Sequence, residues 1–200
     1  MLTKALAIRR AGMKLSKIGA LCKGAKRIIV YNVFGGQWLS DGYVLYPLVD
    51  LPHLDEESVY TIFDIPKDKR SKVQYEERTS LPYGINVADA VTGETPLQYA
   101  GCGISYHGAA YTPMNGKDGI LFIDRRYLAP FSTDVTLYER YYPGSERAYV
   151  AVKRGFLLEG IILPSEVATK ELAQALVKIG RLTALAAGEE DDAEQEEIGI

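Results

Sequence analysis

Three short strands and two tight turns are predicted by residues 28–46, which read IIVYNVFGGQWLSDGYVLY. The β-branched and aromatic residues at the start of this stretch are typical of a strand, and Gly35-Gly36 predicts a turn after them. Asp41-Gly42 is a strong signal for a two-residue hairpin between the next two strands. The stretch therefore predicts an antiparallel sheet close to the beginning of the chain.

An amphipathic helix is predicted just before this sheet. Its apolar face, read at 3.6 residues per turn, consists of Leu15, Ile18, Leu21, Cys22 and Ala25. Its basic residues are Lys14, Lys17, Lys23, Lys26 and Arg27. A basic face of this kind suits phosphate contacts or simple solvation, and the sequence leaves both alternatives open.

The rest of the chain repeats the order of helix and strands. Asp55 is expected to cap a short helix that ends before Pro66, and a second helix-and-strand set begins near Asp124. We therefore predict an α+β protein of two sub-domains, each a short helix with antiparallel strands. The predicted boundaries are residues 1–12 for a frayed N-terminal arm, 13–75 for the first sub-domain, 76–96 for a loop or linker, 97–188 for the second sub-domain with a C-terminal helix, and 189–200 for a disordered acidic tail.

The formal net charge of −3 conceals two oppositely charged ends. Residues 1–27 hold eight Lys and Arg and no acid, whereas residues 189–197 hold seven Asp and Glu and no base. Such blocks are typical of interaction surfaces or solvated tails rather than of catalytic sites. Because no apolar run approaches the ~20 residues that span a bilayer, and two cysteines make no disulfide framework, we expect a cytoplasmic protein with no membrane partner.

Several short motifs resemble a group of phage and prophage proteins of Firmicutes. They are MKLSKI at 13–18, LCK at 21–23, QWLSDG at 37–42, YPL at 46–48, the segment 51–57, FDIP at 63–66 and RYL at 126–128. The resemblance covers most of residues 13–164. It implies a mobile element as the origin and the bacterial host cell as the location, and it carries no known activity.

A second resemblance is to the final part of a DNA sliding-clamp domain. It rests on GILFIDRRYL at 119–128, followed by three predicted strands that end in IILP at 161–164. Clamps are rings whose inner helices present Lys and Arg to the DNA backbone. The resemblance implies a clamp-like fold in which Arg125 and Arg126 join the basic helix in nucleic-acid binding. The Gly-rich stretch 76–116 and the acidic tail depart from the clamp pattern.

The acidic tail ends in Ile198-Gly199-Ile200, and it resembles the tail of bacterial single-stranded-DNA-binding proteins. In that family the tip docks partner proteins while the acids compete with DNA for basic surfaces. The resemblance implies a protein partner for Glu196, Glu197, Ile198 and Ile200. A tail that only solvates the chain is the alternative.

Catalytic and metal-binding motifs are not evident in the sequence. Cys102 and His107 would form a nucleophile–base pair only if the fold brings them together, and a structural Cys with a loop His is the more common arrangement. Two histidines and two cysteines do not supply the three or four ligands of a metal site at recognisable spacing. We therefore predict no catalytic residue, no metal and no cofactor.

Tyrosines fall on many of the predicted strands. Examples are Tyr31, Tyr43, Tyr46, Tyr99, Tyr106 and Tyr138. Aromatic side chains on a sheet stack on single-stranded bases, and they also pack well on a pleated surface. The second interpretation is favoured here.

Three function hypotheses follow from these observations. The first is a non-enzymatic, phage-encoded protein that binds DNA or RNA without sequence specificity, as a clamp-like accessory of replication or recombination and as a possible homo-oligomer. The second is an inhibitor of a host defence or nucleic-acid enzyme, whose acidic surface imitates DNA. The third is an enzyme with an unrecognised site around Cys102 and His107. The first depends on the basic helix, and the second depends on the acidic region.

Overall fold

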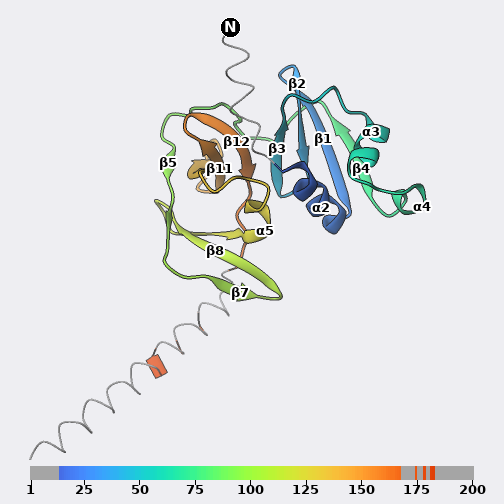
Figure 1. Ribbon diagram of the computed structural model, residues 1–200. Coiled ribbons are helices and arrows are strands. Elements are labelled where there is room, and N and C mark those ends of the chain that lie inside the picture. Colours follow the sequence, from blue (N-terminus) through green and yellow to red (C-terminus); the bar gives the residue numbers. More distant parts are fainter. Residues whose placement is uncertain (1–13, 168–173, 175–177, 179–180, 183–200) are drawn as a thin grey trace, which may run out of the picture. The chain divides into compact units, whose positions relative to one another are not determined.

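The computed structural model describes residues 14–167, 174, 178, 181 and 182. The chain divides into a compact unit that ends at Ser165 and a second unit that begins at Glu166. The first unit has few helices and two sheets, and the larger sheet is mostly antiparallel (Figure 1). The predicted α+β class is therefore confirmed.

The first unit contains the helices α2 (Leu15–Ala25), α3 (Glu56–Ile62), α4 (Lys67–Arg70) and α5 (Arg125–Leu128). The larger sheet is built from β1 (Arg27–Val33), β2 (Gly36–Ser40), β3 (Val44–Leu48), β4 (Gln74–Arg78), β5 (Thr95–Pro96), β10 (Thr136–Tyr141), β11 (Ala148–Arg154) and β12 (Leu157–Ile162). The smaller sheet is built from β6 (Gln98–Tyr99), β7 (Ile104–Tyr106), β8 (Ala109–Asn115) and β9 (Ile120–Asp124).

Strands β1, β2 and β3 form the antiparallel meander that the sequence predicts. Phe34 and Gly35 both have positive φ, so they make the tight turn that pairs Val33 with Gly36. The turn therefore lies one residue earlier than the predicted Gly35-Gly36. The connection from β2 to β3 is longer than the predicted two-residue hairpin. The carboxylate of Asp41 accepts hydrogen bonds from the backbone N–H groups of Tyr43 and Val44, which holds this wider turn in place.

The larger sheet joins strands from both halves of the chain. Its order is β4-β1-β2-β3-β12-β11-β10-β5, with β1 and β4 parallel and the other neighbours antiparallel. The helix α2 precedes the meander β1-β2-β3, and α5 precedes the meander β10-β11-β12. The two meanders meet where β12 pairs with β3, at Ile161 opposite Leu45. Gly160 permits this close approach, because a Cβ there would lie 2.8 Å from the carbonyl oxygen of Leu45.

This pairing differs from the predicted separation into sub-domains 13–75 and 97–188. Residues 79–94, which we call the crossing segment, connect the outermost strands β4 and β5. Leu81, Ile85 and Val87 of this segment pack with Trp38 and Tyr149 in a core on one face of the sheet. The stretch predicted as a loop or linker has no helix or strand between β4 and β5. It nevertheless supplies part of the core, because its apolar residues cover a sheet face that would otherwise meet water.

The other face of the sheet carries the larger core. Ile18 and Cys22 of α2, Val59 and Tyr60 of α3, and Tyr127 of α5 are buried there against strands of both meanders. The helices α2 and α5 consequently lie on the same face of the sheet, with their polar residues directed away from this core. That placement determines which basic side chains can act together.

A buried ionic cluster fixes the crossing segment to β10 and β11. The Glu94 carboxylate pairs with the Arg140 guanidinium at 2.6 Å and with the Lys153 ammonium group. The side chains of Arg140 and Lys153 are only 1% and 5% exposed. Burial alone would raise the pKa of Glu94, but hydrogen bonds from Lys153 and Arg140 hold it below its ordinary value.

Several predictions concern residues outside the described part of the chain. These are the frayed arm at 1–12, the disordered tail at 189–200, and the partner-binding residues Glu196, Glu197, Ile198 and Ile200. Most of the predicted C-terminal helix also lies outside it. Within the described part, no helix is long and apolar enough to cross a membrane.

Candidate nucleic-acid interface

The helix α2 positions the first group of predicted basic residues. Its apolar side is anchored by Ile18 and Cys22, which are 0% and 1% exposed. The backbone N–H of Lys14 donates to the carbonyl oxygen of Pro130 at 2.9 Å, which ties the start of α2 to the segment after α5. Burial, and to a lesser degree Asp41, raises the pKa of Cys22 to about 12, so this thiol is a packing group rather than a nucleophile.

The short helix α5 positions Arg125 and Arg126. The Asp124 carboxylate caps the helix by accepting from the backbone N–H of Arg126 at 2.9 Å, as the sequence predicts. The same carboxylate accepts from the Arg126 guanidinium at 2.6 Å, and the Arg126 side chain is nevertheless 66% exposed. Tyr127 fills the core beneath the helix, and its carbonyl oxygen accepts from the Tyr46 hydroxyl.

Two hollows bring the basic residues of α2 and α5 together. Lys17 and Arg126 line one hollow of about 410 Å³, which also contains Tyr43 and Tyr127. The rings of these tyrosines stack with their centroids 6.1 Å apart. The buried carboxyl of Asp41 also lines this hollow, and burial raises its pKa although two backbone N–H groups donate to it.

The second hollow has a volume of about 640 Å³ and contains Lys14 and Arg125. Threonine, serine and apolar residues make up the rest of its described lining, which contains no Asp or Glu. We call the two hollows together the α2–α5 surface. Its members are Lys14, Lys17, Arg125, Arg126, Tyr43 and Tyr127.

The other predicted basic residues, Lys23, Lys26 and Arg27, lie outside the α2–α5 surface. The Lys23 ammonium group donates to the carbonyl oxygen of Phe63 at 2.9 Å, and the Arg27 guanidinium pairs with Glu76 at 2.8 Å. Lys26 is exposed at the left-handed end of α2. Lys23 therefore ties α2 to the end of α3, and Arg27 ties β1 to β4. Sequence patterns alone do not place Tyr43 and Tyr127 on this surface, because the stacking of their rings depends on the contact between the two halves.

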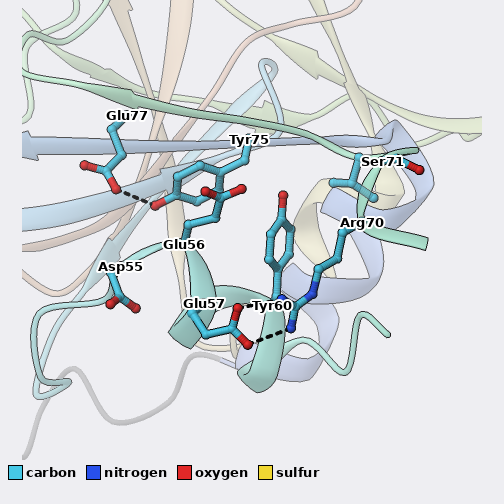
Figure 2. A pocket seen from close by; sticks show the side chains of 9 residues that line it. Asp55, Glu56, Glu57, Tyr60, Arg70, Ser71, Tyr75 and Glu77 are labelled. Atoms are coloured by element: carbon cyan, nitrogen blue, oxygen red, sulfur yellow. Dashed lines mark hydrogen bonds and ion pairs between the residues drawn. The ribbon is translucent and has the colours of Figure 1, made fainter. Parts of the chain in front are cut away.

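An acidic hollow lies at a separate place, between α3 and β4. Figure 2 shows the side chains of Asp55, Glu56, Glu57 and Glu77 around it, together with Arg70 and two tyrosines. The volume of this acidic hollow is about 750 Å³. Four carboxylates and one guanidinium give it an excess of negative charge.

Most of the charged groups in the acidic hollow have local partners. The Asp55 carboxylate accepts from the backbone N–H of Ser58, which confirms its predicted role as a helix cap. Glu57 accepts two hydrogen bonds from Arg70, and these lower the pKa of the Glu57 carboxyl (Figure 2). Glu77 accepts from the hydroxyl of Tyr75 at 2.8 Å.

Cys102 and His107 lie in the smaller-sheet region. Cys102 is exposed, and His107 has a φ of 48° with its ring against Tyr106 at a centroid distance of 4.1 Å. No interaction joins the two side chains in the described part of the chain. That part also contains no group of three or more His, Cys, Asp or Glu residues arranged to hold a metal ion.

Comparison of the chain with protein-family models, with curated proteins and with solved structures finds no match. The resemblances to phage proteins and to sliding clamps therefore stay predictions.

Proposed function

We propose that this chain is a non-enzymatic binding protein of phage or prophage origin that binds DNA or RNA without reading its sequence. The observation that supports the proposal most directly is the composition of the α2–α5 surface. Lys14 shares a hollow with Arg125, and Lys17 shares one with Arg126, although these pairs lie more than a hundred residues apart in the chain. Positive charge from two helices on one sheet face suits a run of phosphates.

The electrostatics of this surface favour phosphate binding. The side chains of Lys14, Lys17 and Arg125 make no ion pair with another residue that the structure describes. Their charges are therefore available to a phosphate backbone, and each contact made would release a counterion. Tyr43, which is 59% exposed, adds a ring on which an unpaired base can stack.

A clamp-like accessory of replication or recombination is the specific form of this proposal. It is supported by the two sets of helix and three strands, which meet in one continuous sheet with α2 and α5 on the same face. Because α5 has four residues and α2 has eleven, most of the basic length comes from α2. Ring formation by several copies is part of this form of the proposal.

The test is a binding titration with fluorescein-labelled single- and double-stranded DNA of two unrelated sequences at several salt concentrations. The triple variant Lys14→Gln, Lys17→Gln, Arg125→Gln is expected to bind about 10-fold more weakly or worse at low salt. Its plot of log affinity against log salt should be flatter by about 2 to 3, since each lost phosphate contact removes about 0.9 on B-DNA. Both sequences should be affected equally.

The matched control is Lys67→Gln, Lys69→Gln, Lys72→Gln. The control also removes three positive charges, but from exposed positions in and after α4. The control should keep the slope of the wild-type protein. Equal affinities and slopes for wild type and the α2–α5 variant would contradict the proposal, as would the absence of DNA and RNA binding by the wild type at low salt.

A second candidate function is inhibition of a nucleic-acid enzyme by DNA mimicry. The acidic hollow at α3 and β4 supports it, because Asp55, Glu56, Glu57 and Glu77 gather on one exposed surface (Figure 2). Capture of a basic enzyme that is lost in Glu56→Gln, Glu77→Gln and kept in the α2–α5 variant would favour this candidate.

A further inference from the structure

A hollow with an uncharged lining lies on the sheet face opposite α2 and α5. It is about 750 Å³ in volume, and it is formed by the ends of β1, β2 and β3, by residues 84–88 of the crossing segment, and by Pro143. Its lining includes Trp38, Val49, Ile85 and Val87, and among the residues that the structure describes it contains no Asp, Glu, Lys, Arg or His. A phosphate or another ion would find no counter-charge here.

The far wall of this hollow is held by buried polar contacts. The backbone N–H of Asn86 donates to the Tyr149 hydroxyl at 3.0 Å, and its carbonyl oxygen accepts from the Arg140 guanidinium at 2.9 Å. Arg140 is in turn paired with Glu94. Because these groups are anchored, the crossing segment does not need a ligand to keep its position, and the hollow is formed in advance.

A missing side chain leaves room inside the hollow. A Cβ at Gly36, which lines it, would meet no atom within 4 Å. Phe34 lies at the mouth of the hollow and is 84% exposed. Its φ of 52° is an uncommon conformation for an aromatic residue. A ligand in the hollow would cover apolar surface that water now contacts.

We propose that this hollow binds a small, uncharged and largely apolar molecule. Its volume lies within the range of about 300 to 1,000 Å³ that is typical of small-molecule sites, and such sites combine apolar walls with few polar groups. The amide of Gln37, which also lines the hollow, is bound to Asn32 and Leu54. The Asn86 side-chain oxygen accepts from the N–H of Ala88, which leaves the amide nitrogen of Asn86 to donate to a carbonyl or ether oxygen of the ligand. The site is independent of the α2–α5 surface.

The test uses Trp38, the one tryptophan of the chain, as a reporter inside the hollow. The neutral fluorophore N-phenyl-1-naphthylamine is titrated into the full chain while energy transfer from Trp38 is recorded. Saturable binding with transfer is expected. The anionic analogue 1-anilinonaphthalene-8-sulfonate should bind more weakly, because the hollow offers its sulfonate no cation.

The variant Gly36→Leu should place an apolar side chain in part of the hollow and weaken binding of the neutral probe by about ten-fold or more. The unfolding temperature should change little, because a Cβ at Gly36 meets open space. Gly103→Leu is the matched control, because a Cβ at Gly103 would also find open space, its nearest contact being 3.9 Å away. Probe binding that Gly36→Leu leaves unchanged, or that occurs without transfer from Trp38, would overturn the proposal. A dimer in sedimentation that Gly36→Leu converts to a monomer would overturn it as well, because the hollow would then be an interface between copies.

Discussion

The α2–α5 surface and the acidic hollow differ in what their charges do within the fold. In the acidic hollow, Asp55 caps a helix and Glu57 is held by two hydrogen bonds from Arg70. On the α2–α5 surface, Lys14, Lys17 and Arg125 make no ion pair within the described part of the chain. A charged side chain that already has a local partner contributes less free energy to binding an external partner, because the existing contact must first be broken.

This difference shows that a count of charges is a poor guide to a binding surface. Residues 1–27 contain eight bases, yet the structure uses Lys23 and Arg27 for internal contacts. The bases that remain available come from two separate segments of the sequence. A binding surface is better indicated by the number of charged side chains that lack an internal partner and lie close together on the surface.

The largest effect is expected in the buried ionic cluster of Glu94, Arg140 and Lys153, in which each charged group has an internal partner. The variant Glu94→Gln leaves Arg140 and Lys153 buried without their counter-ion, so it should lower the free energy of unfolding by about 3 to 5 kcal/mol. Urea unfolding measures this loss. Glu77→Gln, at an exposed position, is the control and should change the unfolding midpoint very little.

The same cluster should make stability depend on pH in the acid range. The pKa of Glu94 is lower in the folded chain than its ordinary value of 4.5, so its stabilising contribution is complete above that value. The contribution is lost as the pH falls through the folded pKa. The difference in stability between wild type and Glu94→Gln should therefore shrink on acidification, and a difference that stays constant from pH 7 to pH 3 would contradict the assignment.

A smaller effect is expected on the α2–α5 surface itself. Asp41→Asn removes the carboxyl from the hollow of Lys17 and Arg126, while an amide oxygen can still accept from the backbone N–H groups of the turn. DNA binding at low salt should become tighter, by about two- to five-fold, because a like charge leaves the binding site. Unchanged or weaker binding by a folded Asp41→Asn protein would mean that DNA does not approach this hollow.

The smallest effect is expected at the acidic hollow. Arg70→Gln releases Glu57 from its pair and removes the guanidinium from the Tyr60 ring. Because the Glu57 side chain is 66% exposed, loss of this ion pair should shift thermal unfolding only slightly. If the acidic hollow binds a basic partner, this variant should bind that partner more tightly than wild type does. Retention on a polylysine resin is compared between wild type and Arg70→Gln. Equal retention of the two proteins would show that the acidic hollow does not bind a basic partner.

Much of the fold could be predicted because its signals are local. Asp55 and Asp124 were both expected to cap helices, and the strands that follow Gly35 and Asp41 lie where turn residues place them. Each of these predictions depends on residues a few positions apart. They needed no knowledge of the tertiary structure.

The parts that could not be predicted depend on distant contacts. The pairing of β3 with β12, the parallel pair β1–β4 and the burial of the crossing segment each join residues far apart in the sequence. The candidate site follows the same pattern. The basic residues were visible in the sequence, but the engagement of Lys23 by Phe63 and the stacking of Tyr43 on Tyr127 were not.

The crossing segment has a consequence for how the chain reaches this structure. It connects two strands that are neighbours in the sequence and lie at opposite edges of an eight-stranded sheet. Seven strand spacings amount to about 34 Å along the sheet, a distance that residues 79–94 can span only in a rather extended form. Because Trp38 lies in one meander and Tyr149 in the other, we expect the core contacts of Ile85 to form only after both meanders have paired. We therefore expect slow folding with a late transition state, in which neither half is stable before the other.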